Sequence, residues 1–255
     1  MDAAQVLVEL RKNPALCLKD LGPWIQTAQE TTPHPAALNA TIPSLPHSLQ
    51  PMVGIQEWFY DLPGGSGAGP YKRNWFAPLT MMSFLAAQRL LKGPRTSIFF
   101  VGRRCWPTLT LLHLVLPLGQ WQTGGIFIDP PTAALRFWVI EQALRCPAVA
   151  AVVADAGECT PVGSRRMQLA AEAGGGYGLL ARPVWEAQES SAARQRWMVQ
   201  PEPTDQKFPR WRLQLNRGQG PMAASDHPEA WLAEWRWNNS GTDGSWLEPC
   251  CFISV

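Results

Sequence analysis

The stretch best suited to binding chemistry is DLPGGSGAGPYKRNWFAPLT, which runs from Asp61 to Thr80. It resembles a phosphate-binding loop of the form G-x-x-x-x-G-K-[ST], in which backbone N–H groups surround the phosphates. In that motif the lysine reaches the β and γ oxygens and the hydroxyl group holds magnesium. The glycines that would form such a loop here are Gly64, Gly65, Gly67 and Gly69.

The residues after Gly69 differ from the motif, because Pro70 and Tyr71 stand where lysine and the hydroxyl residue are required. Proline supplies neither a cation nor a backbone N–H, so a polyphosphate would lose a charge and a donor. One interpretation is a rebuilt anion site that uses Lys72. The other, which the weakness of a lone glycine spacing favours, is a loop that no longer binds phosphate. We predict no resident cofactor, with weak binding of magnesium-ATP left open.

A second candidate acid is Asp155, which ends the apolar run AVAAVVAD. An acid at such a position holds magnesium in nucleoside triphosphatases. An aspartate at the end of a buried strand also commonly caps the next turn, and this is the interpretation we favour. The six Cys form no C-x-x-C pair and the four His are scattered, so the sequence predicts no metal site.

The basic residues are unevenly distributed, since no Asp or Glu lies between Asp61 and Asp129. That stretch carries seven cations, which are Lys72, Arg73, Arg89, Lys92, Arg95, Arg103 and Arg104. Such a block suits a nucleic acid or an acidic protein, and it is equally compatible with basic residues scattered over the surface.

The composition is that of a globular protein, with 46% hydrophobic and 16% charged residues among 255. No apolar run reaches the roughly 20 residues of a membrane-spanning helix, and residues 1–20 lack the pattern of a secretion signal. We therefore expect a cytoplasmic protein without a membrane partner.

The order of elements predicts an α/β fold with a mostly parallel central sheet. The alternating strand pattern GIQEWFY and the apolar patterns TSIFFVG and AVAAVVAD are separated by helix patterns such as 75–92, 131–145 and 164–175. The patterns at 193–200, 209–217 and 230–237 alternate strictly, so we expect antiparallel strands at the C-terminal end. Residues 1–50 are predicted to form a helix and a Pro-rich arm, and residues 51–255 one core domain.

The chain has a family resemblance over about residues 50–240. It rests on the order of the predicted elements and on the segments SRRMQLAAEAGG, SSAARQRWMVQP, PRWRLQLNRGQG and WLAEWRW. The chain resembles the RecA-like family of ImuA proteins, also called SulA-like. These proteins accompany the ImuB subunit, a homologue of Y-family polymerases, and an error-prone replicative-type polymerase in the SOS mutasome. The resemblance implies a RecA-like three-layer core.

The positions at which the chain departs from the RecA pattern all affect residues needed for ATP hydrolysis or DNA binding. The phosphate-loop Lys and Thr fall on Pro70 and Tyr71, and the glutamate that would activate water falls at or beside Arg104. The segments that correspond to the two DNA-binding loops of RecA, Ala156–Gly163 and Val184–Ser191, are short. The resemblance therefore implies a protein without catalytic residues, because phosphoryl transfer needs positioning, charge neutralisation and an oriented water.

Arginines are the candidates for contact with DNA or a partner. Arg165 and Arg166 are expected to open a helix, where their charge opposes the helix dipole. Arg210 and Arg212 share one face of a strand, with Trp211 on the other. The predicted contact residues are Arg103, Arg104, Arg165, Arg166, Arg210, Arg212 and Arg217.

The resemblance thus implies a non-catalytic RecA-like accessory protein in DNA-damage tolerance, acting in SOS mutagenesis and translesion synthesis. Its expected partners are an ImuB-like polymerase homologue and an error-prone replicative-type polymerase subunit, with single-stranded DNA as a further candidate. Two alternatives stay open, namely a divergent ATPase of the RecA class that uses Lys72 and a SulA-like inhibitor of cell division.

Overall fold

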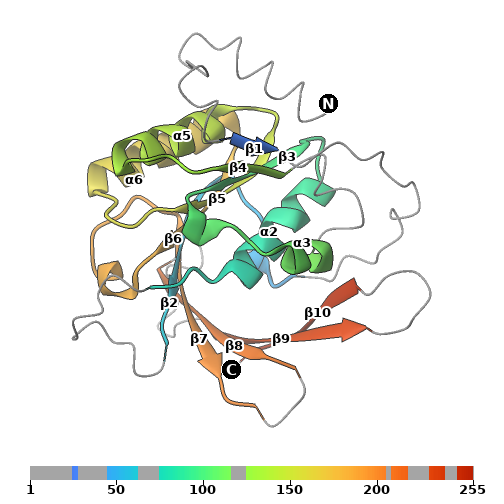
Figure 1. Cartoon of the computed structure of the whole chain (residues 1–255). Coiled ribbons are helices and arrows are strands. Elements are labelled where there is room, and N and C mark those ends of the chain that lie inside the picture. The colour runs from blue at the N-terminus through green and yellow to red at the C-terminus, as the bar shows by residue number, and fades with distance from the viewer. Residues whose placement is uncertain are drawn as a thin grey trace.

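The computed structural model describes residues 25–27, 45–62, 75–115, 125–204, 208–217, 230–238 and 246–254 (Figure 1). The strands are β1 (Ile25–Thr27), β2 (Gly54–Tyr60), β3 (Ser97–Val101), β4 (Gly125–Ile128), β5 (Val149–Asp155), β6 (Tyr177–Arg182), β7 (Gln195–Glu202), β8 (Arg210–Arg217), β9 (Ala230–Asn238) and β10 (Trp246–Ser254). The α-helices are α2 (Leu79–Leu91), α3 (Leu109–Val115), α5 (Ala133–Arg145) and α6 (Pro161–Gly174). Short 3₁₀ helices are η3 (His47–Leu49), η4 (Arg103–Cys105) and η5 (Val184–Glu186).

All described strands belong to one sheet in the order β1-β4-β3-β5-β6-β2-β7-β8-β9-β10. Every pairing from β4 to β7 is parallel, and the pairings β7-β8, β8-β9 and β9-β10 are antiparallel. The strands of the parallel part are mostly apolar, and most of their residues are buried, which is typical of a sheet covered by helices on both sides. The predicted fold class, an α/β RecA-like core with antiparallel strands at its C-terminal end, is confirmed.

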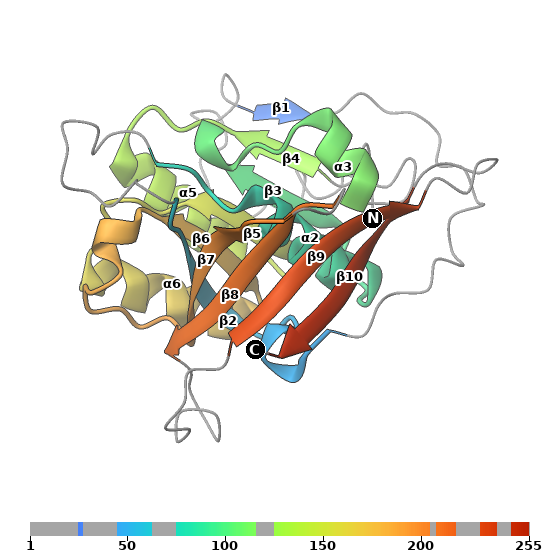
Figure 2. The same cartoon turned by 90° about the horizontal axis from the view of Figure 1, so that it is seen from below.

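The helices form the outer layers. Residues of α2 and α3 share one apolar cluster with Trp58 and Trp197, whereas α5 and α6 belong to a second cluster on the opposite face of the sheet. The antiparallel strands curve over α2, where Phe84 meets Trp235 edge to face at 5.5 Å (Figure 2). The protein therefore encloses α2 between the parallel strands and the C-terminal ones.

Three helix starts differ from the sequence prediction, including that of α5, which begins at Ala133 after the N-cap Thr132 and not at Pro131. The pattern at 75–92 predicts a helix from Trp75, but α2 begins at Leu79, since Pro78 is its N-terminal flanking residue. Helix α6 begins at Pro161, three residues before the expected start at 164, because Thr160 caps it by accepting a hydrogen bond from the Gly163 N–H. Arg165 and Arg166 consequently lie in the second turn of α6, and the expectation that they open the helix is wrong.

Three strand predictions also need correction. Strand β7 is antiparallel to β8, as expected, but it pairs in parallel with β2, because the chain crosses over after β6. The edge strand β10, paired with β9, was not predicted. Strand β1, which pairs with β4 at the other edge, lies in the predicted N-terminal arm, where the prolines dominate the local pattern.

None of the described helices is long and apolar enough to cross a membrane.

The α6–β6 connection offers a test of the fold. Gly176 packs so tightly against the carbonyl of Leu144 that a Cβ atom would overlap its oxygen. We expect Gly176→Ala to lower the free energy of unfolding by about 1–3 kcal/mol in urea titrations, since backbone must move to make room. The control is Gly93→Ala, whose Cβ would lie 3.5 Å from the Arg89 oxygen. Equal effects of the two substitutions would contradict this packing.

Candidate functional site

A pocket of about 620 Å³ lies at the carboxyl ends of the parallel strands. Gly102, Arg103 and Arg104 follow β3, Asp129 follows β4, and the segments after β5 and β6 complete the walls. The chain leaves β3 toward the face that carries α3 and leaves β5 toward the face that carries α6, and β3 and β5 are neighbours. A crevice opens where adjacent strands connect in opposite directions, and this is where open α/β sheets bind ligands.

Asp155 forms the floor of the pocket. One of its oxygens, Oδ1, accepts a hydrogen bond from the Gly157 N–H at 3.0 Å and so caps the turn, as the favoured interpretation of the sequence predicts. The other oxygen lies 3.7 Å from Nε of Arg104 and 3.8 Å from Nη1 of Arg136. A metal ion at this carboxylate would therefore face two guanidinium groups.

The arginines around Asp155 are held in place by packing. The Arg104 guanidinium stacks over the Trp75 ring at 5.2 Å, a cation–π contact. Gly102 adopts φ 82°, and a side chain there would press on Asp155 and Arg136, so glycine is required by both conformation and space. At the rim, Nε of Arg103 donates a hydrogen bond to Asp129 at 2.5 Å.

Glu158, on the wall formed after β5, has a left-handed backbone with φ 67°. This conformation is uncommon for a residue with a side chain and is favoured at sites where the surroundings impose it. Its N–H donates a hydrogen bond to Oε1 of Glu186 at 2.9 Å, which ties the segment after β5 to η5. Glu158 lines the pocket, and its side chain is exposed.

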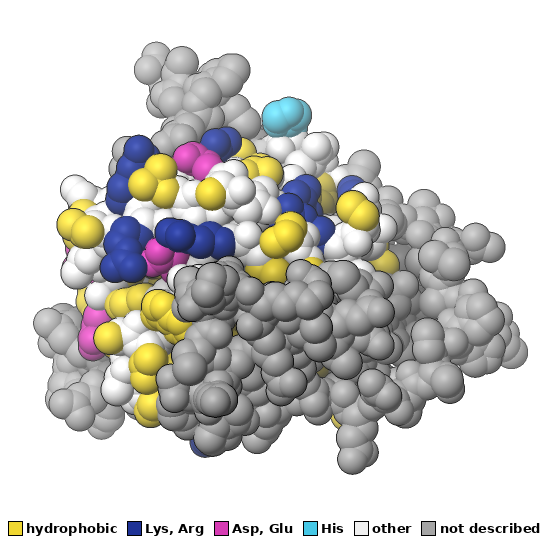
Figure 3. Space-filling model, turned by 90° about the horizontal axis from the view of Figure 1, so that it is seen from above, with side chains coloured by type: hydrophobic (Ala, Val, Ile, Leu, Met, Phe, Trp, Pro, Cys, Tyr) yellow, Lys and Arg dark blue, Asp and Glu magenta, His cyan; other side chains and the backbone are white. Residues whose placement is uncertain are grey.

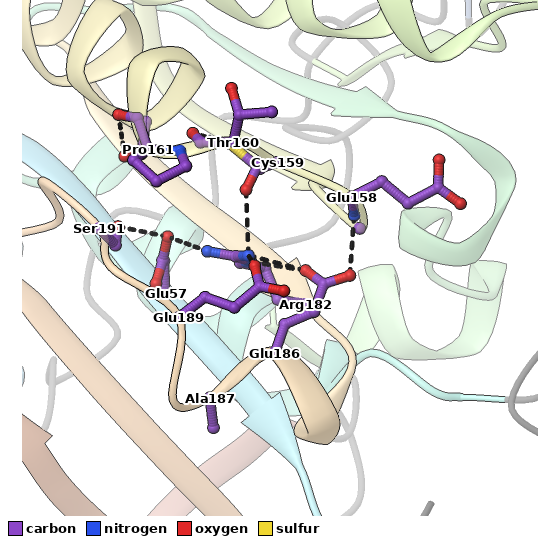
Figure 4. Close-up of polar contacts among 12 residues, drawn as sticks. Glu57, Glu158, Cys159, Thr160, Pro161, Arg182, Glu186, Ala187, Glu189 and Ser191 are labelled. Carbon is purple, nitrogen blue, oxygen red and sulfur yellow. Dashed lines mark hydrogen bonds and ion pairs between the residues drawn. The ribbon is translucent and has the colours of Figure 1, made fainter.

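Behind the pocket lies a buried ionic network centred on Glu57 of β2 (Figure 4). Its carboxylate accepts hydrogen bonds from Nη1 of Arg182 at 2.9 Å, from Nε of Arg196 at 2.7 Å and from the Ser191 hydroxyl at 2.6 Å. The side chains of Glu57 and Arg182 are completely buried. Each charge is thus compensated, as a buried ion requires.

Arg182 connects this centre with the pocket wall. Its guanidinium donates to Glu186 at 2.9 Å, to Glu189 at 2.7 Å and to the carbonyl of Cys159 at 3.1 Å. Burial alone lowers the pKa of Arg182, but the charge of Glu57 and the hydrogen bonds to acids raise the pKa above its ordinary value. Arg182 therefore stays charged at every physiological pH.

Arg196 secures the other side of the same network. Its Nη1 donates to the Ala187 carbonyl at 2.9 Å, and its guanidinium stacks over the ring of Phe59 at 5.0 Å. Together the two arginines contact both segments that the family resemblance equates with DNA-binding loops, Ala156–Gly163 through Cys159 and Val184–Ser191 through Glu186, Ala187 and Glu189. Both segments are tied to the sheet by buried charged groups.

Covalent chemistry by a cysteine is disfavoured at this site. Burial raises the pKa of the Cys159 thiol to about 12, against an opposing effect of Arg182. Burial likewise raises the pKa of Cys105, below the pocket, well above its ordinary value. Both thiols are protonated near neutral pH, and the thiolate is the nucleophilic form. Within the described parts of the chain, no cluster of three or more His, Cys, Asp or Glu side chains is arranged to hold a metal ion.

The structure places the sequence-predicted residues in three different regions. Arg103 and Arg104 lie at the pocket. Arg166 bonds Glu141 across the helices at 2.7 Å, and the neighbouring Arg165 is exposed on α6. The remaining arginines of the prediction lie on β8. The glycine loop and Lys72, together with Pro70 and Tyr71, lie outside the described residues, as does the side chain of Arg217.

Two arginines of β8 are paired with acids on neighbouring strands. Arg210 bonds Glu234 of β9, and Arg212 bonds Glu202 of β7 at 3.2 Å and 3.3 Å. Figure 3 shows basic groups on the face with α5 and α6 that are separated by other side chains, with acidic groups beside some of them. A nucleic acid or partner at these arginines has to compete with their carboxylates.

Sequence reasoning missed Glu57, Arg136, Arg182 and Trp185. Two of them carry a signal that was available: Glu57 interrupts the apolar strand GIQEWFY, and Arg182 ends the apolar strand YGLLAR. Opposite charges inside two buried strands indicate a buried pair, because an isolated charge there is too costly. Arg136 and Trp185 stand in ordinary helix and loop contexts that give no such signal.

Comparison with known proteins finds no family model that matches the chain and no matching curated protein.

The network predicts that two Glu→Gln substitutions lower the free energy of unfolding by very different amounts. Glu57→Gln leaves two buried guanidiniums without their shared counter-charge, so we expect a loss of about 3–5 kcal/mol in the free energy of unfolding, measured in urea. Glu189→Gln removes a carboxylate whose side chain is 52% exposed, and we expect at most about 1 kcal/mol. Similar losses for both variants would show that Glu57 is not the centre of the network.

Proposed function

We propose that this protein is a non-catalytic RecA-like accessory protein in DNA-damage tolerance. In this proposal it acts in the cytoplasm in SOS mutagenesis and translesion synthesis, where it binds an ImuB-like polymerase homologue. An error-prone replicative-type polymerase subunit completes the assembly, and single-stranded DNA is a further candidate ligand. The proposal draws its biological setting from the sequence resemblance and its architectural support from the RecA-like sheet.

The observation that carries the non-catalytic part is the environment of Asp155. In a RecA-like ATPase, the acid at the end of this strand has to help hold magnesium. Here its Oδ2 faces Nε of Arg104 and Nη1 of Arg136 at 3.7 and 3.8 Å. Two positive charges at that distance oppose a divalent cation and already neutralise the carboxylate. Arg104 also stands at or beside the position of the water-activating glutamate.

The fixed segments after β5 and β6 support an accessory role as well. A RecA-type filament needs segments that order on DNA and respond to nucleotide. In this chain Arg182 and Arg196 anchor both segments to β2 through Glu57. A site whose walls are already rigid presents one constant surface, which suits a subunit that recognises and positions a partner.

The proposal makes a direct prediction in the native host. Deleting the gene should lower damage-induced mutation to the level of undamaged cells, and the tagged protein should capture the polymerase homologue from damaged cells. Growth without damage and cell length after damage should stay normal. Unchanged mutation frequency together with failure to capture the polymerase homologue would contradict the proposal, and altered cell length would favour the division inhibitor instead.

A second prediction concerns nucleotide. Calorimetry with magnesium-ATP should show little or no heat, and phosphate release should stay at the level of buffer, because Pro70 and Tyr71 replace the cation and the metal-holding hydroxyl. Micromolar affinity that disappears in Lys72→Ala, with Arg165→Gln as an exposed control, would instead establish the divergent ATPase.

A further inference from the structure

The pocket at the carboxyl ends of β3 to β6 has two chemically different ends. Arg103, Arg104 and Arg136 line the side formed by η4 and α5, and Glu158 lies on the opposite side, after β5. The indole rings of Trp75 and Trp185 line the same pocket. We propose that this pocket binds one nucleotide unit of single-stranded DNA, with the phosphate at the arginines and an amino-bearing base at Glu158.

The arginine end is suited to a single phosphate. Arg guanidiniums bind phosphate oxygens through several parallel N–H groups, and charge-assisted hydrogen bonds of this kind are the strong ones. Nε of Arg136 is buried without a hydrogen-bond acceptor among the described residues, although its guanidinium is close to Asp155. The Nη1 group of Arg136 lies 3.8 Å from Asp155, beyond hydrogen-bond distance, so a phosphate oxygen in the pocket would give this group a closer acceptor.

The indoles account for the flat part of the ligand. Trp75 is already covered by Arg104 and packed at Gly157, where a Cβ atom would come within 3.2 Å of the ring, so Trp185 is the indole available for stacking. Trp185 of η5 is 38% exposed, a large apolar surface at the pocket rim. Stacking of a nucleic-acid base on an aromatic side chain contributes about 1–3 kcal/mol.

Glu158 supplies an acceptor at the other end. Glu186, its neighbour in the wall, already accepts hydrogen bonds from the Glu158 N–H and from Arg182. Asp129 already accepts a hydrogen bond from Arg103. Asp155 accepts one from the Gly157 N–H and lies close to Arg104 and Arg136. The exposed Glu158 carboxylate can therefore accept from a base amino group, which cytosine, adenine and guanine possess and thymine lacks.

The overall charge favours a nucleotide unit over a polyphosphate. The pocket-lining side chains comprise three arginines and four carboxylates, one of which, Glu186, is neutralised by Arg182 from outside the lining set. With Arg182 included, the charges balance, so the site offers no excess positive charge for a polyphosphate, whereas a backbone phosphate needs only the local contacts with the arginines. Its volume of about 620 Å³ lies within the range of small-ligand sites, about 300–1,000 Å³.

This inference deepens the proposed function and rests on it, because it names the DNA unit and the residues that recognise it. The test uses the full-length protein, with tryptophan fluorescence and calorimetry at about 50 mM salt, where phosphate contacts are strongest. The probes are single-stranded oligo(dC) and oligo(dT), the mononucleotides dCMP and dTMP, and inorganic phosphate.

We expect oligo(dC) to bind with an affinity that falls as salt rises, and dCMP to bind about tenfold more tightly than dTMP, the effect of one hydrogen bond to a charged group. Inorganic phosphate should bind at least about tenfold more weakly than dCMP, since it lacks the stacked base. Binding of free dCMP but not of oligo(dC) would overturn the assignment to a DNA strand. Equal affinity for phosphate and dCMP would overturn the assignment to a nucleotide.

Three variants assign the contacts. Arg136→Gln should weaken phosphate and dCMP alike, Trp185→Ala should weaken only dCMP, and Glu158→Ala should remove the preference for dCMP over dTMP. The control is Arg145→Gln, which changes an exposed arginine at the C-terminal end of α5, outside the pocket. Thermal unfolding identifies any variant that fails to fold. If Arg136→Gln fails to fold, Trp185→Ala still tests the proposal, because Trp185 is exposed.

Unchanged dCMP binding in both Trp185→Ala and Glu158→Ala would overturn the proposal. Capture of the polymerase homologue by the same variants distinguishes failure of the DNA-binding inference from failure of the proposed function. Lost DNA binding with retained capture is the result expected for a DNA contact made within the assembly. Absence of any DNA binding by the unmodified protein, with capture intact, would end this inference and leave the partner-binding part of the proposed function standing.

Discussion

Glu57 is a fully buried carboxylate in a central strand, and the arrangement of the candidate site depends on how its charge is compensated. Transferring an ion out of water costs several kcal/mol even after the protein relaxes, so neither this acid nor its two arginines tolerate burial alone. Arg182 and Arg196 reach Glu57 and also donate to the carbonyls of Cys159 and Ala187. One electrostatic requirement therefore determines the course of both segments that wall the pocket.

Asp155 shows the same principle at the pocket floor. The RecA-like sheet brings an acid to the position where a metal-dependent enzyme needs one, and the chain places Arg104 and Arg136 beside it. These cations make a divalent ion unfavourable and offer N–H groups to an anion instead. In the site that we propose, the same fold would hold an anion in place of a metal ion through the side chains at the carboxyl ends of the strands alone.

The sheet and the order of its helices could be predicted because apolar runs such as AVAAVVAD are long and are separated by clear helix patterns. The pairing of β7 with β2 could not, since alternation within a strand does not reveal a parallel neighbour far away in the sequence. The role of Asp155 as a turn cap followed from its place at a strand end. Its two arginine neighbours come from η4 and α5, and only the folded sheet brings them together.

The central claim is that the pocket walls are fixed by buried ionic contacts rather than ordered by a ligand. Native-state hydrogen exchange of the Gly157 and Glu158 amides tests it most directly, because these N–H groups donate to Asp155 and Glu186. We expect both amides of the ligand-free protein to be protected as strongly as those of neighbouring β5. Exchange at the rate of an unstructured peptide, with slow exchange only after DNA or a partner is added, would contradict the claim.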